Sequence, residues 1–375
     1  MRTSLLSEKL QEKLQLVNHA ISNKNQLPIL LNFLIKAQKG SLTISATDLE
    51  IGIKVEIPAN TEENGETTVP AKTFLELINT IPAGKIILGT KKEGLELLGE
   101  KIKTIFQTVS SDEFPKLYEE RGGEALTISK NIIKKDLPKI VFATSQDLTR
   151  PALSGVLIRN DPQKDEGLLM VATDGYRLSI KKYNSSGKDK IKESISVIIP
   201  GKVLRELILI NKGNDEIKTY VSKEINQVVF FQNDTTLVGR LIEGEFPAFE
   251  KIIPQGFSVK TIFDKEDLER AVKACYIFAR NAANIVKLSI QKDKMIASAS
   301  TPSLGQNTIE IEAKTTGEEN EIAFNCRYLL DFLSNIGEET LSFEMTGPLN
   351  PGVFKISGDD SFLHLIMPIR IQEET

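Results

Sequence analysis

The sequence predicts an α+β protein built from three copies of one unit of about 125 residues. Three observations point to it: a strand followed by an amphipathic helix recurs three times, a second helix opens each copy, and alternating apolar and polar residues fill the stretches between. A chain of 375 residues is also too long for one hydrophobic core. Each copy is expected to pack two helices on an antiparallel sheet.

The strand and helix that recur are marked by a small residue or a proline at the helix start. Pro70 and Pro200 stand 130 residues apart, each directly before a helical pattern, where proline is favoured. In each segment apolar residues repeat at the spacing of one helix face. The three segments are 67–82, 196–213 and 321–337.

A further helix is predicted at the start of each copy, over 7–22, 129–145 and 264–282. Ser7, Ser129 and Asp264 are the expected N-caps, because their side-chain oxygens can accept from free backbone amides. Pro138 lies inside the second of these segments and should kink or shorten that helix.

The stretches between the helices have strand patterns, and equivalent motifs within them give the length of the repeat. Thr47-Asp48 and Thr173-Asp174 follow equivalent apolar runs and lie 126 residues apart, while 294–313 is a diverged third copy. The predicted domains are therefore 1–123, 124–256 and 257–375.

The composition is that of an ordinary cytoplasmic protein. Hydrophobic residues make up 40% of the chain and charged residues 26%, with no apolar run long enough for a membrane span and no apolar signal region at the start. Cys275 and Cys326 are far apart and have no metal-like spacing, so we expect two reduced, buried thiols. The prediction is a cytoplasmic protein without a membrane segment.

The charge distribution is uneven although the net charge is only −4. The six predicted helices carry a net charge of about +6, with the excess on 130–145, 200–212 and 265–282, so the rest of the chain is acidic. Such helices could hold phosphates without reading bases. The alternative is that these lysines and arginines only solvate helix faces, and charge alone does not decide between the two.

Catalytic motifs are missing from the sequence. His19 and His364 are the only histidines, and no phosphate-binding glycine loop or nucleophile elbow occurs. Asp48 and Asp174 occupy equivalent repeat positions, which explains both without a paired-carboxylate site. No metal, cofactor or catalytic residue is expected; the remaining alternative is a hydrolase or transferase on a repeated α+β scaffold.

The chain resembles the bacterial DNA polymerase III β subunit, the β sliding clamp. The stretches that carry the resemblance follow the family's order over essentially the whole chain, and together they are highly specific. They are LPILLNFLI (27–35), ATDLEIGI (46–53), TTVPAKTFLELI (67–78), DEFPKL (112–117), RPALSGVLI (150–158), VATDGYRLS (171–179), IIPGK (198–202), GEFPAFEKIIP (244–254) and MPIRI (367–371).

The resemblance implies a function without chemistry. Two copies would form a head-to-tail homodimer, a ring of six domains with helices lining the hole, which encircles double-stranded DNA without sequence specificity. The ring would tether the DNA polymerase III α subunit and raise its effective concentration at the primer. Further implied partners are the clamp loader and other proteins with a clamp-binding motif, such as repair polymerases, ligase and mismatch-repair proteins.

The resemblance also assigns residues to three sites. Phosphate contacts are expected from Lys24, Lys130, Lys134, Lys135, Lys139, Arg150, Lys202, Arg205, Arg270, Lys273 and Arg280. A pocket for a partner's linear peptide is expected from Leu153, Thr173, Gly175, Tyr176, Arg177, Leu178, Pro247, Ile252, Leu365 and Met367, with Arg150 and Arg177 able to bond the peptide at the rim. The dimer joint is expected to place Phe106 of one chain near Ile277 and Phe278 of the other.

Alternatives remain for each of these sites. From the residues alone, Asp174-Gly175 fits a plain tight turn, and the apolar dimer residues fit an ordinary domain core. The family often has His where this chain has Tyr176, Pro138 leaves the facing of Lys134 to Lys139 open, and Ala152 lacks the aromatic ring of some clamps. We assign no role to Gln372–Thr375 at the end of the chain.

Overall fold

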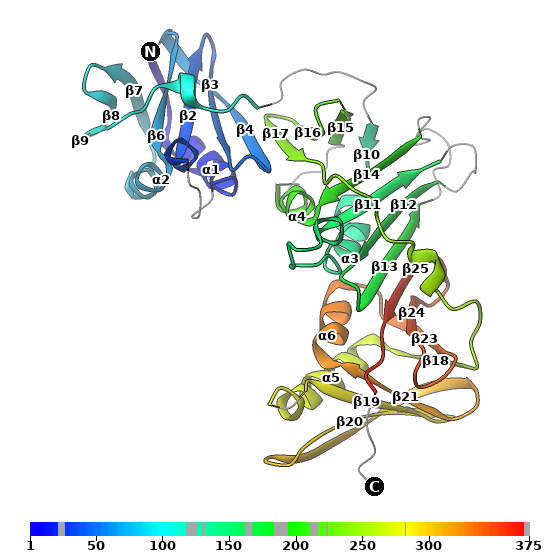
Figure 1. Ribbon diagram of the computed structural model, residues 1–375. Helices are drawn as coiled ribbons and strands as arrows, with labels where there is room; N and C mark the ends of the chain where they lie inside the picture. The colour runs from blue at the N-terminus through cyan, green and yellow to red at the C-terminus, as the bar shows by residue number, and fades with distance from the viewer. Residues whose placement is uncertain are drawn as a thin grey trace. The chain divides into compact units, whose positions relative to one another are not determined.

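The computed structural model describes residues 1–21, 27–117, 126–129, 132–161, 167–183, 194–210, 217–222, 224–281 and 283–370 (Figure 1). Its contacts divide the chain into two compact units, Met1–Lys130 with Lys202–Leu241 and Asn131–Gly201 with Ile242–Thr375. The division runs through the second predicted repeat. The domain boundaries near 123 and 256 therefore stay predictions.

The first repeat has the predicted order of two helices among antiparallel strands. Its helices are shorter than the sequence pattern suggested, because only residues with helical hydrogen bonds belong to them. The elements are β1 (Arg2–Leu6), α1 (Ser7–Asn18), β2 (Asn32–Gln38), β3 (Ser41–Thr47), β4 (Ile51–Pro58), β5 (Asn60–Glu63), β6 (Gly65–Pro70), α2 (Ala71–Thr80), β7 (Lys85–Lys91), β8 (Gly94–Gly99) and β9 (Ile102–Phe106).

The second repeat keeps this order but has a broken first helix. As expected for Pro138, a π-helical turn, Ile132–Asp136, ends before the proline and a single turn, α3 (Pro138–Val141), follows it. The other elements are β10 (Leu126–Ile128), β11 (Gly155–Asn160), β12 (Leu168–Thr173), β13 (Arg177–Tyr183), β14 (Ile195–Pro200), α4 (Gly201–Ile210), β15 (Ile217–Ser222), β16 (Gln227–Gln232) and β17 (Thr235–Arg240).

The third repeat contains the longest helix among the described residues, α5. Asp264 caps it as predicted, accepting from the amides of Glu266 and Asp267, whereas Ser7 is the first residue of α1. The positions directly after Ser129, 130 and 131, lie outside the described residues, so its capping role stays a prediction. The elements are β18 (Val259–Asp264), α5 (Lys265–Ala279), β19 (Ile285–Ile290), β20 (Lys294–Thr301), β21 (Gly305–Gly317), β22 (Asn320–Asn325), α6 (Cys326–Asn335), β23 (Thr340–Met345), β24 (Gly352–Ile356) and β25 (Asp359–Ile366).

In each unit one sheet continues from one repeat into the next. In the first unit β17 pairs with β4, from Thr235 opposite Val55 to Gly239 opposite Ile51. In the second unit β13 pairs with β25 in the same antiparallel sense, over five residue pairs that begin at Arg177. The two joints are equivalent, because each starts three residues after the aspartate of a Thr-Asp pair.

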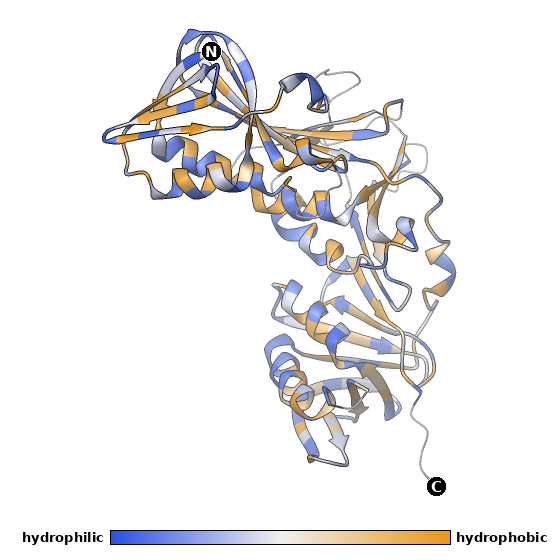
Figure 2. Cartoon of the chain, turned by 60° about the vertical axis from the view of Figure 1, so that its left-hand side comes forward, coloured by the Kyte–Doolittle hydropathy of each residue, from blue (hydrophilic) through white to orange (hydrophobic). Residues whose placement is uncertain are grey.

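The helices cover one face of these sheets and complete the cores. Hydrophilic and hydrophobic residues alternate along the helices (Figure 2), as is usual for helices that bury one face. In the first unit α1 packs against α2, β3 and β4, with Leu10, Leu14 and Val17 fully buried. In the second unit α5 packs against α6 and the β19–β21 strands. The predicted α+β class with antiparallel sheets is confirmed.

Candidate partner site and nucleic-acid interface

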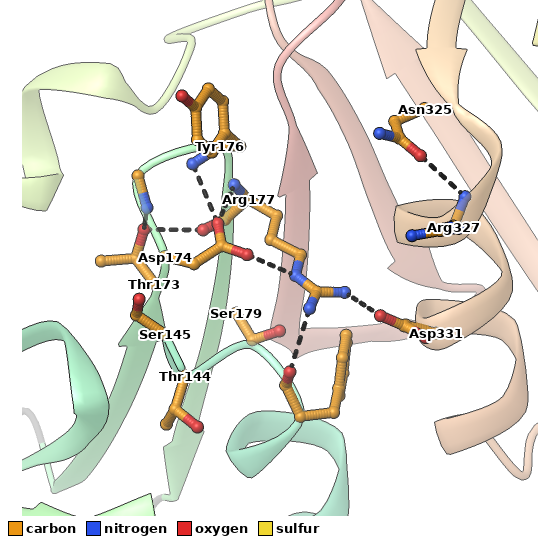
Figure 3. Close-up of polar contacts among 12 residues, drawn as sticks. Thr144, Ser145, Thr173, Asp174, Tyr176, Arg177, Ser179, Asn325, Arg327 and Asp331 are labelled. Atoms are coloured by element: carbon orange, nitrogen blue, oxygen red, sulfur yellow. Dashed lines mark hydrogen bonds and ion pairs between the residues drawn. The ribbon is translucent and has the colours of Figure 1, made fainter. Parts of the chain in front are cut away.

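The turn between β12 and β13 is fixed by the side chains that the sequence placed there. Asp174 Oδ1 accepts from the amides of Tyr176 and Arg177 at 2.9 and 3.0 Å (Figure 3). Thr173 Oγ1 accepts from the Gly175 amide at 3.1 Å and donates to the Arg177 carbonyl at 2.6 Å. Gly175 has φ +93°, a value that costs glycine little. The expected tight turn is present, and it aims Tyr176 outward.

Arg177 connects the second repeat to the third. Its Nε donates to Asp174 Oδ2 at 2.9 Å, Nη1 donates to Asp331 Oδ2 at 2.7 Å, and Nη2 donates to the Phe142 carbonyl at 3.3 Å (Figure 3). The guanidinium lies over the rings of Phe142 and Tyr328, 5.4 and 4.8 Å from their centroids. Arg177 is only 8% exposed, so it holds the site together and does not stand at its rim as we had expected.

An exposed apolar surface lies beside this arginine. Tyr176 is 61% exposed and stacks on Tyr328, with ring centroids 6.2 Å apart. The Met367 amide donates to the Tyr176 carbonyl at 2.8 Å, and the Met367 side chain is exposed as well. Pro247 and Ile252, from the segment before β18, are also exposed. Aromatic, aliphatic and thioether side chains of this kind accept varied apolar partners.

The remaining predicted pocket residues are buried beneath that surface. Leu178 and Leu365 face each other across β13 and β25, have no exposed area, and belong to one apolar cluster that includes Val353. Leu153 and Thr173 are 7% and 6% exposed. These side chains support the site from within, and a partner can touch Leu178 or Leu365 only if their neighbours move.

Arg150 lies at the edge of the same site. Its side chain is exposed, and Nη1 would be 3.6 Å from a Cβ placed on Gly175. The sequence predicts two roles for Arg150, a phosphate contact and a peptide contact at the rim, and its position beside the Gly175 turn suits the second, a bond to an acidic or backbone group of a bound peptide.

The expected phosphate-binding residues of α4 and α5 are exposed, but several already have carboxylate partners. Lys202 pairs with Asp48, and Arg270 and Lys273 pair with acidic residues one turn earlier in α5. Arg205 and Arg280 are exposed at the surface of α4 and after the end of α5. The cationic ends of these pairs face solvent, whereas the carboxylates of Asp48 and Glu269 are largely buried.

The broken helix of the second repeat divides its lysines between surface and interior. Lys134 and Lys135 are exposed on the π-helical turn. Lys139 is 5% exposed and pairs with Glu338, because Pro138 starts a new turn that directs it inward. The expectation of a phosphate contact from Lys139 was therefore wrong. Two further candidates, Lys24 and Lys130, lie outside the described residues.

The predicted dimer residues differ in exposure. Phe106 is 6% exposed and packs edge-on against Phe74 at 5.2 Å, so its side chain belongs to the core of its own repeat. Its neighbour Ile105 is 38% exposed on β9, the last strand of its sheet. Ile277 on α5 is 54% exposed and Phe278 is half-buried.

Family models match nearly the whole chain in three consecutive parts. The N-terminal, central and C-terminal domains of the DNA polymerase III beta subunit match residues 1–118, 127–248 and 250–370. The chain belongs to the DNA polymerase III β subunit family. Members of this family are sliding clamps, which act as processivity factors in DNA replication and catalyse no reaction. The enzyme alternative is thereby excluded.

Relatives from the β subunit family resemble the chain over nearly its full length. The beta sliding clamps of Staphylococcus aureus (strain Mu50) and Staphylococcus epidermidis are each 30% identical over 363 residues, which is 94% of both chains. The crystal structure of the Bacillus subtilis sliding clamp matches with a TM-score of 0.93 and 26% identity, and covers 99% of this chain and 100% of its own. A Streptococcus pyogenes beta subunit has the same fold, with a TM-score of 0.92. The predicted fold of three clamp domains is confirmed.

Three residues of the β-subunit site escaped the sequence analysis. Tyr328 and Asp331, both on α6, contact the Arg177 guanidinium. The sequence predicts the helix α6. An aromatic residue and a carboxylate three residues apart on one face of that helix were the signal that could have identified them. Ile105 was hidden by its neighbour Phe106. Across the described ranges, no group of His, Cys, Asp and Glu could hold a metal ion, and no helix is long and apolar enough to cross a membrane.

Proposed function

We propose that two copies of this chain form a closed ring around duplex DNA, each contributing three domains, 1–123, 124–256 and 257–375. The carrying observation is the repetition of one joint. β17 pairs with β4 and β25 pairs with β13 through five residue pairs each, at equivalent positions of successive repeats. A third joint of the same kind needs the last strand of the first repeat and a strand of the third repeat.

Both strands for that third joint have an unpaired edge. β9 ends its sheet, with β8 as its only neighbour among the described strands, and β21 pairs with β20 along Gly305–Glu312 but with β18 only from Ala313 onward. Exposed apolar side chains stand at each edge, Ile105 beside one and Leu304 beside the other. Antiparallel pairing of β9 with residues 305–309 of a second copy would cover both edges and close a head-to-tail dimer.

DNA binding in this proposal is electrostatic and independent of sequence. Lys134, Lys135 and Arg205 offer exposed cations on the helices of the second repeat. The ion-paired lysine and arginine side chains of α4 and α5 also face solvent and add to this cationic surface. Contacts of this kind permit sliding, because no base has to be read.

The surface around Tyr176 and Met367 is proposed to bind the linear peptides of partner proteins. An apolar patch next to Arg150 suits an extended segment with apolar anchors and an acidic or backbone group at one end. We propose the DNA polymerase III α subunit, the clamp loader and clamp-motif proteins of repair and ligation as the partners, with the cytoplasm as the place of action.

Retention on circular DNA tests the proposed phosphate contacts. The triple variant Lys134→Glu, Lys135→Glu and Arg205→Glu should leave a loaded, nicked circular DNA faster than the wild type at low salt, and the difference should shrink at high salt because charge contacts are screened. A matched variant reverses three exposed lysines of strands and hairpins, Lys39, Lys92 and Lys182, and should be retained like the wild type. Equal loss from both variants, or from neither, would contradict the assignment.

A further inference from the structure

A cavity lies on the sheet of the third repeat. It has a volume of about 170 Å³, and its walls include Pro254 and Phe257 on one side and Glu344, Val353 and Lys355 on the other. Phe257 is 49% exposed, and Lys260 Nζ lies 5.6 Å from the centre of its ring. The cavity therefore combines an aromatic wall, an aliphatic floor and charged groups.

The strand register connects this cavity to the apolar surface proposed for partner peptides. Leu178 is opposite Leu365, Leu365 is opposite Val353, Val353 is opposite Glu344, and Glu344 is opposite Lys260. Directly opposed residues share a face of the sheet, so the five side chains form one row across β13, β25, β24, β23 and β18. The row runs from purely apolar to charged.

The charged end of the row carries more positive than negative groups. Glu344 accepts from Lys355 at 2.6 Å and pairs with Lys260 at 3.0 Å, and it is itself 6% exposed. Burial alone would raise the pKa of Glu344, but the hydrogen bonds from Lys355 and Lys260 outweigh it and lower that pKa, so the carboxylate stays ionised. Each ammonium has three donors and gives one to Glu344. One excess positive charge remains for a further anion.

We propose that this cavity is a second subsite for partner peptides, and that it takes an acidic side chain flanking the apolar anchors. The inference rests on the proposed peptide site around Tyr176 and Met367. Glu344 lies two strands across from Leu365, and the exposed Met367 is two residues further along the chain, which puts the two side chains roughly 12 Å apart at the usual spacings, a distance that an extended peptide covers in three to four residues. The carboxylate of an Asp or Glu at that distance would receive hydrogen bonds from Lys355 and Lys260 against the Phe257 ring.

Peptide binding measured by fluorescence polarisation tests the subsite. The probes are three labelled peptides with the same two apolar anchors: one with Glu three residues before the anchors, one with Glu three residues after them, and one with Gln at both places. One of the two Glu peptides should bind the wild-type dimer about two- to five-fold more tightly than the Gln peptide, the range expected of a partly exposed ion pair. The preference should fall as salt is added.

Two variants, one that removes a positive charge and one that removes a negative charge, test which residues of the cavity bind the acidic side chain. Lys355→Gln should abolish the preference for Glu and leave affinity for the Gln peptide unchanged, whereas Glu344→Gln should increase the preference because it frees both lysines. Lys294→Gln is the matched control, since Lys294 also pairs with a glutamate on the adjacent strand, Glu310 at 2.7 Å, and should change nothing. Thermal melting of each variant shows that it is folded.

The outcomes separate this subsite from the peptide site itself. If all three peptides bind the wild type equally and Lys355→Gln has no effect, the subsite is overturned while the peptide site stands. If no peptide binds, or if Tyr176→Ala leaves every affinity unchanged, the proposed peptide site fails and the subsite fails with it. A change of dimer mass on Lys355→Gln with unchanged peptide affinities would assign the cavity to a second copy of the chain, and would also overturn the proposal.

Discussion

Ser179 and His364 face each other across the strand pair that joins the second repeat to the third, with Ser179 Oγ 2.7 Å from His364 Nδ1. Both side chains are fully buried, and the imidazole lies parallel to the Phe332 ring at 4.6 Å. Burial, with a smaller contribution from the nearby Arg177 charge, lowers the pKa of His364 well below its usual value. This joint therefore depends on a neutral histidine.

Stability should fall below the ordinary pKa of histidine, about 6.5. The unfolded chain takes up a proton there and the folded chain does not, so acid favours unfolding by up to about 1.4 kcal/mol for each pH unit below that value. Urea denaturation at pH 7.5 and 5.5 measures the loss, which His364→Phe should reduce. An equal loss in the wild type and in His364→Phe would contradict the assignment.

The two carboxylates that pair with Arg177, those of Asp174 and Asp331, should contribute unequally to stability. Asp174→Asn keeps the Oδ1 acceptor for the turn but removes the charge beside a buried guanidinium, and should lower the free energy of unfolding by about 2 kcal/mol. Asp331 has a side chain that is 51% exposed, so Asp331→Asn should cost only about 0.5 kcal/mol. Urea unfolding of both variants tests the order, and a larger loss for Asp331→Asn would contradict it.

Alanine variants of Met367 and Leu365 should affect peptide binding and folding stability to different degrees. Met367 is exposed, so Met367→Ala should weaken binding of a polymerase tail peptide and leave the melting temperature near that of the wild type. Leu365 is fully buried, so Leu365→Ala should cost about 2–4 kcal/mol of stability as well. Calorimetry and thermal melting check both, and unchanged peptide affinity in Met367→Ala would remove Met367 from the site.

The proposed dimer joint should be sensitive to charge at its strand edges. Ile105→Asp or Leu304→Asp would place an unpaired carboxylate between the two copies, and should shift the mass in solution from about twice 41.6 kDa toward the single-chain value. Light scattering after size-exclusion chromatography measures the mass. Leu148→Asp is the control, because Leu148 is 79% exposed and belongs to neither strand; a dimer that survives both edge variants would contradict the pairing.

The fold could be predicted because the sequence repeats itself. Thr47-Asp48 and Thr173-Asp174 begin the same joint in successive repeats, and a periodic pattern observed more than once is more reliable than a single one. The turn at Asp174 and the break at Pro138 followed from local chemistry, since an Asx turn and a missing amide need no distant partner.

Contacts between distant segments could not be predicted in the same way. The sequence pattern predicts Lys139 as a surface cation, but in the structure it is buried and pairs with Glu338, which lies 199 residues later in the chain. Arg177 looked free because Asp331 comes from another repeat. The exposure of Leu178 and Leu365 depends on which strands become neighbours, and hydrophobicity alone does not tell a lining side chain from a supporting one.

The strand pairing of β17 with β4 and of β13 with β25 makes the middle repeat incomplete by itself. Produced as an isolated fragment, it would expose backbone amides and carbonyls along both outer strands and would tend to associate with any available edge. Its neighbours in the chain supply the strands that cover both edges, and autonomous folding is not expected of it.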